Sequence, residues 1–243
     1  MHIIDVIVWL FIGVMVAASI VFRKLTVAGA LTGGCLAALL YKGAGVTGII
    51  MLGAFFVAGS VVTALGRSKK EQLGVAEKNK GQRTAWQVLA NGGVAGLAAL
   101  LAWLKPEQAP LWQLAAAASL ASASADTLSS ELGSVYGRSF YNILTFKKDT
   151  CGLDGVVSLE GTLCGIAGSM LIAAIYLVAY KHFVFSCWIV LAGFAGNLAD
   201  SVLGASLERK GWLKNDQVNL LNTIIAAVTG LCGYWLFTHP AAT

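Results

Sequence analysis

Long apolar stretches dominate this chain and decide which folds are open to it. Eight of them follow one another, at about residues 4–22, 25–41, 46–65, 85–104, 110–132, 156–180, 184–207 and 218–237. A helix of about 20 apolar residues spans a bilayer, whereas the strands of a membrane barrel would alternate apolar and polar residues. That alternation is absent. The sequence therefore predicts an all-α, polytopic integral membrane protein with about eight transmembrane helices.

The composition predicts that only a small part of the chain lies outside the membrane. Of the 243 residues, 57% are hydrophobic and 12% are charged, and the mean hydropathy is +0.75. The longest polar segments are only about 67–84 and 133–155. We therefore expect a single transmembrane domain over residues 1–243, with the functional motifs within 67–223. The five cysteines have no metal-ligand spacing, which argues against a zinc site or a disulfide framework.

The basic residues predict the orientation of the chain. Of the 17 Lys and Arg, 14 fall in the first, third, fifth and seventh connections between apolar stretches, and three fall in the other connections. Basic residues concentrate in cytoplasmic loops, so the odd-numbered connections are predicted to be cytoplasmic and both termini outside. This distribution also explains the net charge of +5 without nucleic acid as a partner. We expect a multi-pass protein of the cell (inner) membrane.

Two carboxylates lie unusually deep in apolar sequence. Asp126, in "SADTLSSELG" (124–133), and Asp200 are predicted to lie at the cytoplasmic ends of the fifth and seventh helices. A carboxylate within a membrane helix is costly and marks a functional site by default. Small and amide residues at helical spacing can instead serve only to hold helices together. Polar residues on four helices gather at the basic face, however, and that one-sidedness favours a site facing the cytoplasm.

The connection "LTFKKDTCGLDGVVSLEGT" (144–162) offers complementary charge. Lys147 and Lys148 precede glycines that lead into a helix, where backbone N–H groups and a lysine can bind phosphate. Beside the carboxylates, this pattern predicts a phosphate–metal site in which Mg²⁺ is held by Asp126, Glu131 and Asp200. The predicted catalytic residues are Asp126, Lys147, Lys148 and Asp200. The predicted nucleotide- or phosphate-binding residues are Asn91, Ser130, Gly152, Asp154, Gly155, Ser158, Asn219 and Asn222.

Histidine is absent from the predicted cytoplasmic side. His2, His182 and His239 all fall on the predicted outer side, so Ser-His-Asp hydrolysis is excluded at this site. Phosphoryl transfer remains open, because it depends mainly on positioning and electrostatics. No Walker A pattern is present, so the site is not a P-loop.

Five pieces of sequence together resemble one family. They are "GVAEKNKGQRTAWQVLANGG" (74–93), "SADTLSSELG", "TFKKDTCGLDGVVSLEGTL" (145–163), "GNLADSVLGASL" (196–207) and "VNLLNT" (218–223). In this order they resemble the integral membrane family that contains plant and cyanobacterial phytyl-phosphate kinase and animal transmembrane protein 19. The third piece departs from the usual family pattern, because Cys151, Leu153, Asp154 and Val156 stand where Pro, Thr, Asn and Gly are usual.

The resemblance implies an enzyme. It implies a CTP-dependent kinase that converts a prenyl or phytyl monophosphate to the diphosphate at the cytoplasmic membrane face, in isoprenoid salvage. Its partners would be a nucleoside triphosphate, the prenyl monophosphate and the lipid bilayer, with Mg²⁺ as cofactor. Two alternatives stay open at this point: a membrane transporter with intramembrane carboxylates, and a lipid enzyme similar to the cytidylyltransferases.

Overall fold

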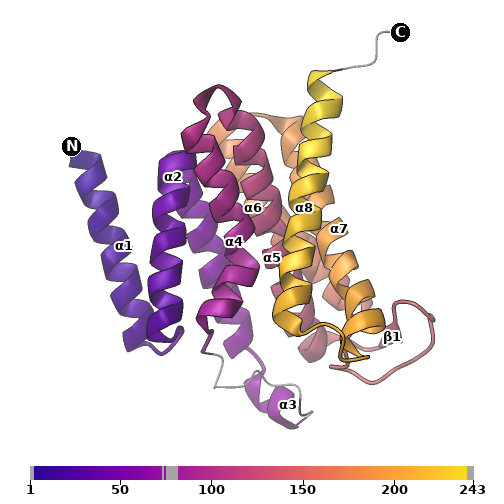
Figure 1. The fold of residues 1–243 in the computed structure, drawn as a ribbon. Coiled ribbons are helices and arrows are strands. Elements are labelled where there is room, and N and C mark those ends of the chain that lie inside the picture. Colours follow the sequence, from indigo (N-terminus) through magenta and orange to yellow (C-terminus); the bar gives the residue numbers. More distant parts are fainter. Residues whose placement is uncertain (1–2, 73, 75–81, 240–243) are drawn as a thin grey trace.

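The computed structural model describes residues 3–72, 74 and 82–239, and its long elements are all helices (Figure 1). The long helices are α1 (Ile3–Val21), α2 (Val27–Ala64), α4 (Ala85–Leu104), α5 (Ala109–Tyr136), α6 (Leu159–Tyr180), α7 (Phe183–Leu203) and α8 (Asn215–Thr238). The shorter elements are α3 (Arg67–Gln72), a 3₁₀ turn (Pro106–Gln108), a π-helical turn (Gly204–Glu208), and the antiparallel strands β1 (Tyr141–Asn142) and β2 (Val156–Val157).

Six helices in the described part of the chain are long and apolar enough to cross a membrane. They are α1, α2, α4, α6, α8 and the segment Phe183–Glu208, which includes α7. The predicted all-α membrane architecture with several spans is confirmed. The count of eight spans and the outward location of the termini stay predictions.

Helix α2 is two antiparallel arms joined at Gly45. This glycine has φ 61° and ψ −150°, a backbone conformation that side chains rarely allow. Gly29 lies against the carbonyl of Arg83, and Gly59 lies against the Arg83 guanidinium. Thirty residues of straight helix would separate the two glycines by about 45 Å, so the chain must fold back between them. The second and third predicted stretches correspond to these two arms.

Helix α5 forms the centre of the bundle. It packs against α2, α4, α6, α7 and α8, and every residue from Leu114 to Ala125 is buried. Its Ala and Ser side chains allow neighbouring backbones to approach closely: Gly168 of α6, for example, packs against the Ser124 carbonyl. A helix covered by protein on all sides needs less apolar side-chain surface than one facing lipid, which explains why α5 is not among the six.

Two predicted helix ends differ from the structure. Helix α5 continues to Tyr136, so Asp126 lies about ten residues before its end, and the prediction that Asp126 marks a helix end is wrong. The polar continuation is supported by α6, because Gly133 lies against Gly161. Helix α6 begins at Leu159 instead of at residue 156, because Val156 and Val157 pair with β1.

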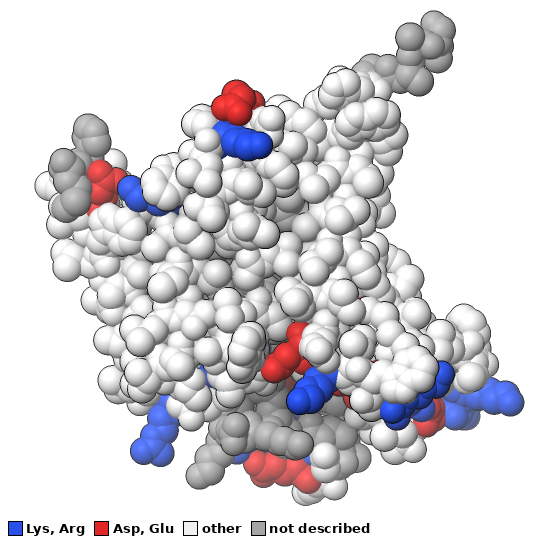
Figure 2. All heavy atoms as spheres, in the orientation of Figure 1, with Lys and Arg blue, Asp and Glu red and all other residues white. Residues whose placement is uncertain are grey.

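The two ends of the bundle differ in charge. The first residues of α1 and the last residues of α8 lie toward one end, and α3 and β1 lie at the other (Figure 1). Most of the visible Lys and Arg side chains gather at the end with α3 and β1 (Figure 2). This arrangement agrees with the charge split read from the sequence. Lys78 and Lys80, which that count included, lie outside the described residues.

Candidate active site

A polar cavity of about 330 Å³ opens at the end of the bundle that carries β1. Its walls come from the start of α4, the second half of α5, the loop before α6, the end of α7 with the π-helical turn, and the start of α8. Most of the predicted site residues line it: Asn91, Asp126, Ser130, Glu131, Gly152, Asp154, Gly155, Ser158, Asp200 and Asn219. The structure therefore brings together residues that lie up to 128 positions apart in the sequence.

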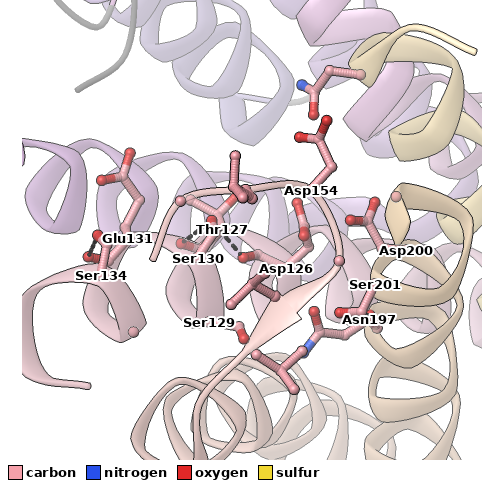
Figure 3. Close-up of a pocket in the computed structure, with 18 of the residues that line it drawn as sticks. Asp126, Thr127, Ser129, Ser130, Glu131, Ser134, Asp154, Asn197, Asp200 and Ser201 are labelled. Carbon is pink, nitrogen blue, oxygen red and sulfur yellow. Dashed lines mark hydrogen bonds between the residues drawn. The ribbon is translucent and has the colours of Figure 1, made fainter. Parts of the chain in front are cut away.

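Asp126 and Asp200 form the centre of this cavity. Their carboxyl groups lie beside each other, one from α5 and one from α7 (Figure 3). They are close enough to interact directly, and Glu208 lies within electrostatic range of both. Asp154, on the loop before α6, interacts electrostatically with Asp200. The result is a cluster of carboxyl groups at the end of a membrane bundle.

Asn222 lies behind the acid pair and does not line the cavity. Its Nδ2 donates a hydrogen bond of 2.8 Å to Asp200 Oδ1, and its Oδ1 accepts one of 3.0 Å from Ser122 Oγ. Asn222 is fully buried. The structure therefore places this predicted phosphate-binding residue where it orients Asp200.

Arg83 is the cation that faces the acid pair, and it is not among the site residues predicted from the sequence. Its guanidinium lies within electrostatic range of Asp126 and 5.6 Å from the centre of the Phe55 ring. A Cβ at Gly59 would lie 2.8 Å from a guanidinium nitrogen, so the glycine makes room for this side chain. Arg83 directly precedes Thr84, the N-cap of α4, and its backbone pairs with Lys24 and Thr26. One feature of the sequence could have indicated Arg83, because it lies within 74–93, one of the five pieces that resemble the family.

Two buried amide oxygens at the cavity have no hydrogen-bond partner among the described residues. They are Oδ1 of Asn91, which is 7% exposed, and Oδ1 of Asn219, which is 8% exposed. Asn91 Nδ2 donates to the Gln87 carbonyl, which fixes the side chain. An unpaired buried oxygen costs free energy, and a cation or a ligand donor in the cavity would remove that cost.

The loop before α6 closes over the cavity. Gly152 and Gly155 have φ of 85° and 70°, and Gly155 packs so closely on Ala205 that a Cβ would lie 2.3 Å from the alanine Cβ. Arg209 anchors the loop, since its Nε donates to the Asp154 carbonyl and its Nη2 donates to Asp149 Oδ2 at 2.8 Å. The Thr150 N–H and then the Arg209 guanidinium hold the pKa of Asp149 below its ordinary value.

The loop leads into the N-terminus of α6. Ser158 caps this helix, because its Oγ accepts a hydrogen bond of 3.1 Å from the Gly161 N–H. This cap satisfies one of the free N–H groups at the start of the helix. On α5, the predicted phosphate-binding residue Ser130 lies one turn after Asp126. Its Oγ donates a hydrogen bond of 2.9 Å to the Asp126 carbonyl (Figure 3).

Three predicted residues lie apart from the acid pair. Lys147 and Lys148 are exposed and are not among the residues that line the cavity. They belong to the return strand of a tight turn, in which Tyr141 bridges to Lys148. Glu131 lines the cavity, but its carboxylate forms an ion pair with Lys70, whose side chain is 3% exposed.

The donor set fits a magnesium ion bound together with phosphate. Mg²⁺ is commonly held by one or two carboxylates, with phosphate oxygens and water as the other ligands. Asp126 and Asp200 supply two carboxylates, and the unpaired oxygens of Asn91 and Asn219 are of the same hard type. Across the described residues, no group of three or more His, Cys, Asp or Glu could hold a metal by itself. An ion held by these two carboxylates would take phosphate oxygens or water as its remaining ligands.

Known proteins provide an independent comparison. The family model described as "Integral membrane protein DUF92" matches residues 10–227. An uncharacterized membrane protein of Synechocystis sp. is 35% identical, over 81% of this chain and 77% of its own. Protein VTE6, chloroplastic, of Arabidopsis thaliana is 30% identical, over 89% of this chain and 67% of its own. An uncharacterized membrane protein of Methanocaldococcus jannaschii is 36% identical, over 76% of each chain. No solved structure matches.

Proposed function

This chain belongs to the integral membrane protein family DUF92, and we propose that it is a CTP-dependent kinase that converts a prenyl or phytyl monophosphate to the diphosphate. The predicted family membership is confirmed. The resemblance of five sequence pieces to the family that contains phytyl-phosphate kinase supports a kinase of this type. The observation that carries the proposal is the pairing of Asp126 with Asp200 in a polar cavity that Arg83 also lines. We place this site at the cytoplasmic face of the cell membrane.

The charge of the cavity supports a requirement for a divalent cation. Among the described lining residues, five are acidic (Asp126, Glu131, Asp154, Asp200 and Glu208), and the basic one is Arg83. A phosphate anion would be repelled from such a cavity unless cations came with it. In our proposal Asp126 and Asp200 hold Mg²⁺, which when bound neutralises phosphate charge and helps to orient the reacting groups.

The proposed reaction requires little acid–base catalysis by the protein. A phosphate oxygen of the prenyl monophosphate attacks the γ-phosphorus of the nucleotide, a new P–O bond forms, and the bond between the γ-phosphorus and its bridging oxygen breaks. The nucleoside diphosphate then leaves. A phosphate monoester has its second pKa at about 6, so the attacking oxygen is already deprotonated at neutral pH and needs no histidine base.

The chain's own residues position the two substrates. Arg83 supplies a fixed planar charge for phosphate oxygens, a role that suits guanidinium. The loop from Gly152 to Gly155 presents backbone groups at the cavity, and Asn91 and Asn219 add polar atoms to its inner wall. Phosphoryl transfer needs alignment and charge stabilisation above all, and these groups offer both.

A double-label experiment tests the proposal. The purified protein is incubated in detergent with Mg²⁺, phytyl monophosphate and CTP labelled at either the α- or the γ-phosphate. We expect the γ label to enter the lipid and the α label to remain in CDP. Entry of the α label into the lipid would identify a cytidylyltransferase instead.

The matched control is Asp126→Asn, which should abolish γ transfer. Absence of transfer with CTP, ATP, GTP and UTP, across prenyl chains of several lengths, would overturn the kinase assignment. In that case Na⁺ or H⁺ uptake into proteoliposomes without any nucleotide would support the transporter reading.

A further inference from the structure

A second cavity, of about 460 Å³, meets the polar one at Arg83, Gln87 and Asn91. It is a groove between α1, the two arms of α2 and the start of α4. Three residues, Arg83, Gln87 and Asn91, line both cavities, so the two spaces share a wall. We propose that this groove binds the hydrocarbon chain of the lipid phosphate whose head group reaches Asp126 and Asp200; this inference rests on the proposed function for the identity of its ligand.

The wall of the groove away from the junction is suited to hydrocarbon. Representative lining residues are Ile7, Phe11, Ile50 and Phe56. The one hydroxyl on the α1 side, Ser19 Oγ, is already used, since it donates to the Val16 carbonyl at 2.8 Å. A nucleotide base or a sugar would find no polar partner there, whereas an alkyl or isoprenoid chain needs none.

The length and direction of the groove match a lipid anchored at its phosphate. On α1 the lining residues run from Ile7 to Ser19, which corresponds to about 18 Å along a helix axis. The polar junction lies at the start of α4, and Ile7 lies toward the opposite end of α1. A chain whose phosphate is at Arg83 would therefore extend along α1, away from the polar cavity.

Arg83 lies where the phosphate and the hydrocarbon chain of such a ligand would meet, because it lines both cavities. Its guanidinium lies 5.6 Å from the centre of the Phe55 ring, which lines the groove, and within electrostatic range of Asp126. Asn91 adds a second observation, because its buried Oδ1 lacks a partner at the same junction. An amphipathic ligand needs its charge recognised where its chain begins, and this junction supplies that recognition.

Filling the groove tests the proposal. Gly53 lines it, and a Cβ there would meet no atom within 4 Å, so Gly53→Phe adds a ring to the groove without a backbone clash. Gly13 of α1 is exposed, does not line the groove and is equally open, which makes Gly13→Phe the matched control. We expect Gly53→Phe to raise the KM for phytyl monophosphate by about tenfold or more, the scale on which apolar pockets respond to small changes in fit. The KM for a five-carbon prenyl monophosphate should change less than twofold.

A binding assay separates this inference from the proposed function. A phytyl monophosphate analogue with a diazirine at the far end of its chain is photolysed with the protein in detergent. We expect labelling of the groove-lining faces of α1 and α2, competition by unlabelled phytyl monophosphate, and loss of labelling in Gly53→Phe but not in Gly13→Phe. Such labelling without any phosphoryl transfer would contradict the proposed kinase activity but support the inference that the groove binds the lipid chain. Labelling spread over the outer faces of α6 and α7, unchanged by Gly53→Phe, would show that the groove is an ordinary lipid-facing surface and would overturn the inference.

Discussion

Asn222 of α8 donates a hydrogen bond of 2.8 Å to Asp200 of α7, and the same amide accepts one of 3.0 Å from Ser122 of α5. A single buried side chain thereby ties three helices together behind the acid pair. Because Asn222 reaches the cavity only through Asp200, it is a positioning residue. Partners of this kind fix the orientation of a carboxylate that binds metal.

Replacing Asn222 should therefore affect magnesium dependence as well as stability. We expect Asn222→Ala to lower the free energy of unfolding by about 1–3 kcal/mol, since it leaves buried groups unpaired. It should also weaken Mg²⁺ binding or turnover by about 10- to 100-fold, the usual effect of removing an outer partner. Titration of activity against Mg²⁺ and thermal unfolding in detergent measure the two effects. Ser122→Ala is the control: it should lower stability but leave the magnesium dependence nearly unchanged.

The polar site could be predicted in outline because its residues stand out from their surroundings. Asp126, Asp200 and Asn222 are costly in apolar sequence, and three helices carry them toward one basic face. Arg83 could not be assigned in the same way, since an arginine next to a membrane usually reports only topology. Its role depends on the packing of the second arm of α2, where Gly59 admits the guanidinium beside Asp126.

Lys147 and Lys148 were predicted in the site, but the structure places them outside the cavity lining. Lys147 and Lys148 lie next to the glycine loop in sequence, so proximity to the cavity was a reasonable prediction. In the structure Asn142 Oδ1 accepts hydrogen bonds from Leu144 and Thr145, and Phe146 has φ 55°, so a tight turn precedes the lysines. That turn directs the lysine segment back along β1 and leaves both side chains exposed. Such turn geometry cannot be read from the periodicity of apolar residues.

Loss of one carboxylate should remove stabilisation by magnesium. Two carboxylates beside each other repel, and a bound cation relieves that repulsion and stabilises the folded protein by mass action. We expect MgCl₂ to raise the Tm of the native protein in detergent, and Asp126→Asn or Asp200→Asn to reduce that rise strongly. Activity should fall by orders of magnitude, while the Tm without Mg²⁺ stays equal or increases. An undiminished rise in either variant would mean that its carboxylate does not contribute to cation binding.

Arg83 should be sensitive to the shape of its charged group as well as to its charge. We expect Arg83→Gln to raise the KM for the lipid phosphate by about tenfold or more, because charge-assisted hydrogen bonds to phosphate are lost. Arg83→Lys should recover only part of the loss, because ammonium does not reproduce the guanidinium fork. Arg138, whose side chain is 90% exposed, provides the control, and Arg138→Gln should leave the kinetics unchanged. Equal KM values in the native protein and Arg83→Gln would remove Arg83 from the site.

The orientation in the membrane can be tested with single cysteines in a cysteine-free background. Arg138 lies just after α5 at the basic end, and Glu107 lies between α4 and α5 at the other end. We expect a cysteine at position 138 to react with an impermeant maleimide only after the membrane is opened, and one at position 107 to react in intact cells. The reverse pattern would place the cavity outside the cytoplasm, where CTP is not available, and would contradict the proposed kinase.

The two lysines distinguish direct phosphate binding from long-range attraction. The sequence predicts a direct contact, for which the compact ammonium of lysine could not be replaced by the broader guanidinium. The exposed positions of Lys147 and Lys148 outside the cavity lining favour attraction of the nucleotide through charge alone. We therefore expect Lys147→Arg and Lys148→Arg to retain the KM for CTP. Lys147→Gln together with Lys148→Gln should raise that KM by about two- to fivefold at low salt, with little effect at high salt, where exposed charges are screened. A strong, salt-independent loss in either arginine variant would instead show that the loop moves and that a lysine contacts phosphate during turnover.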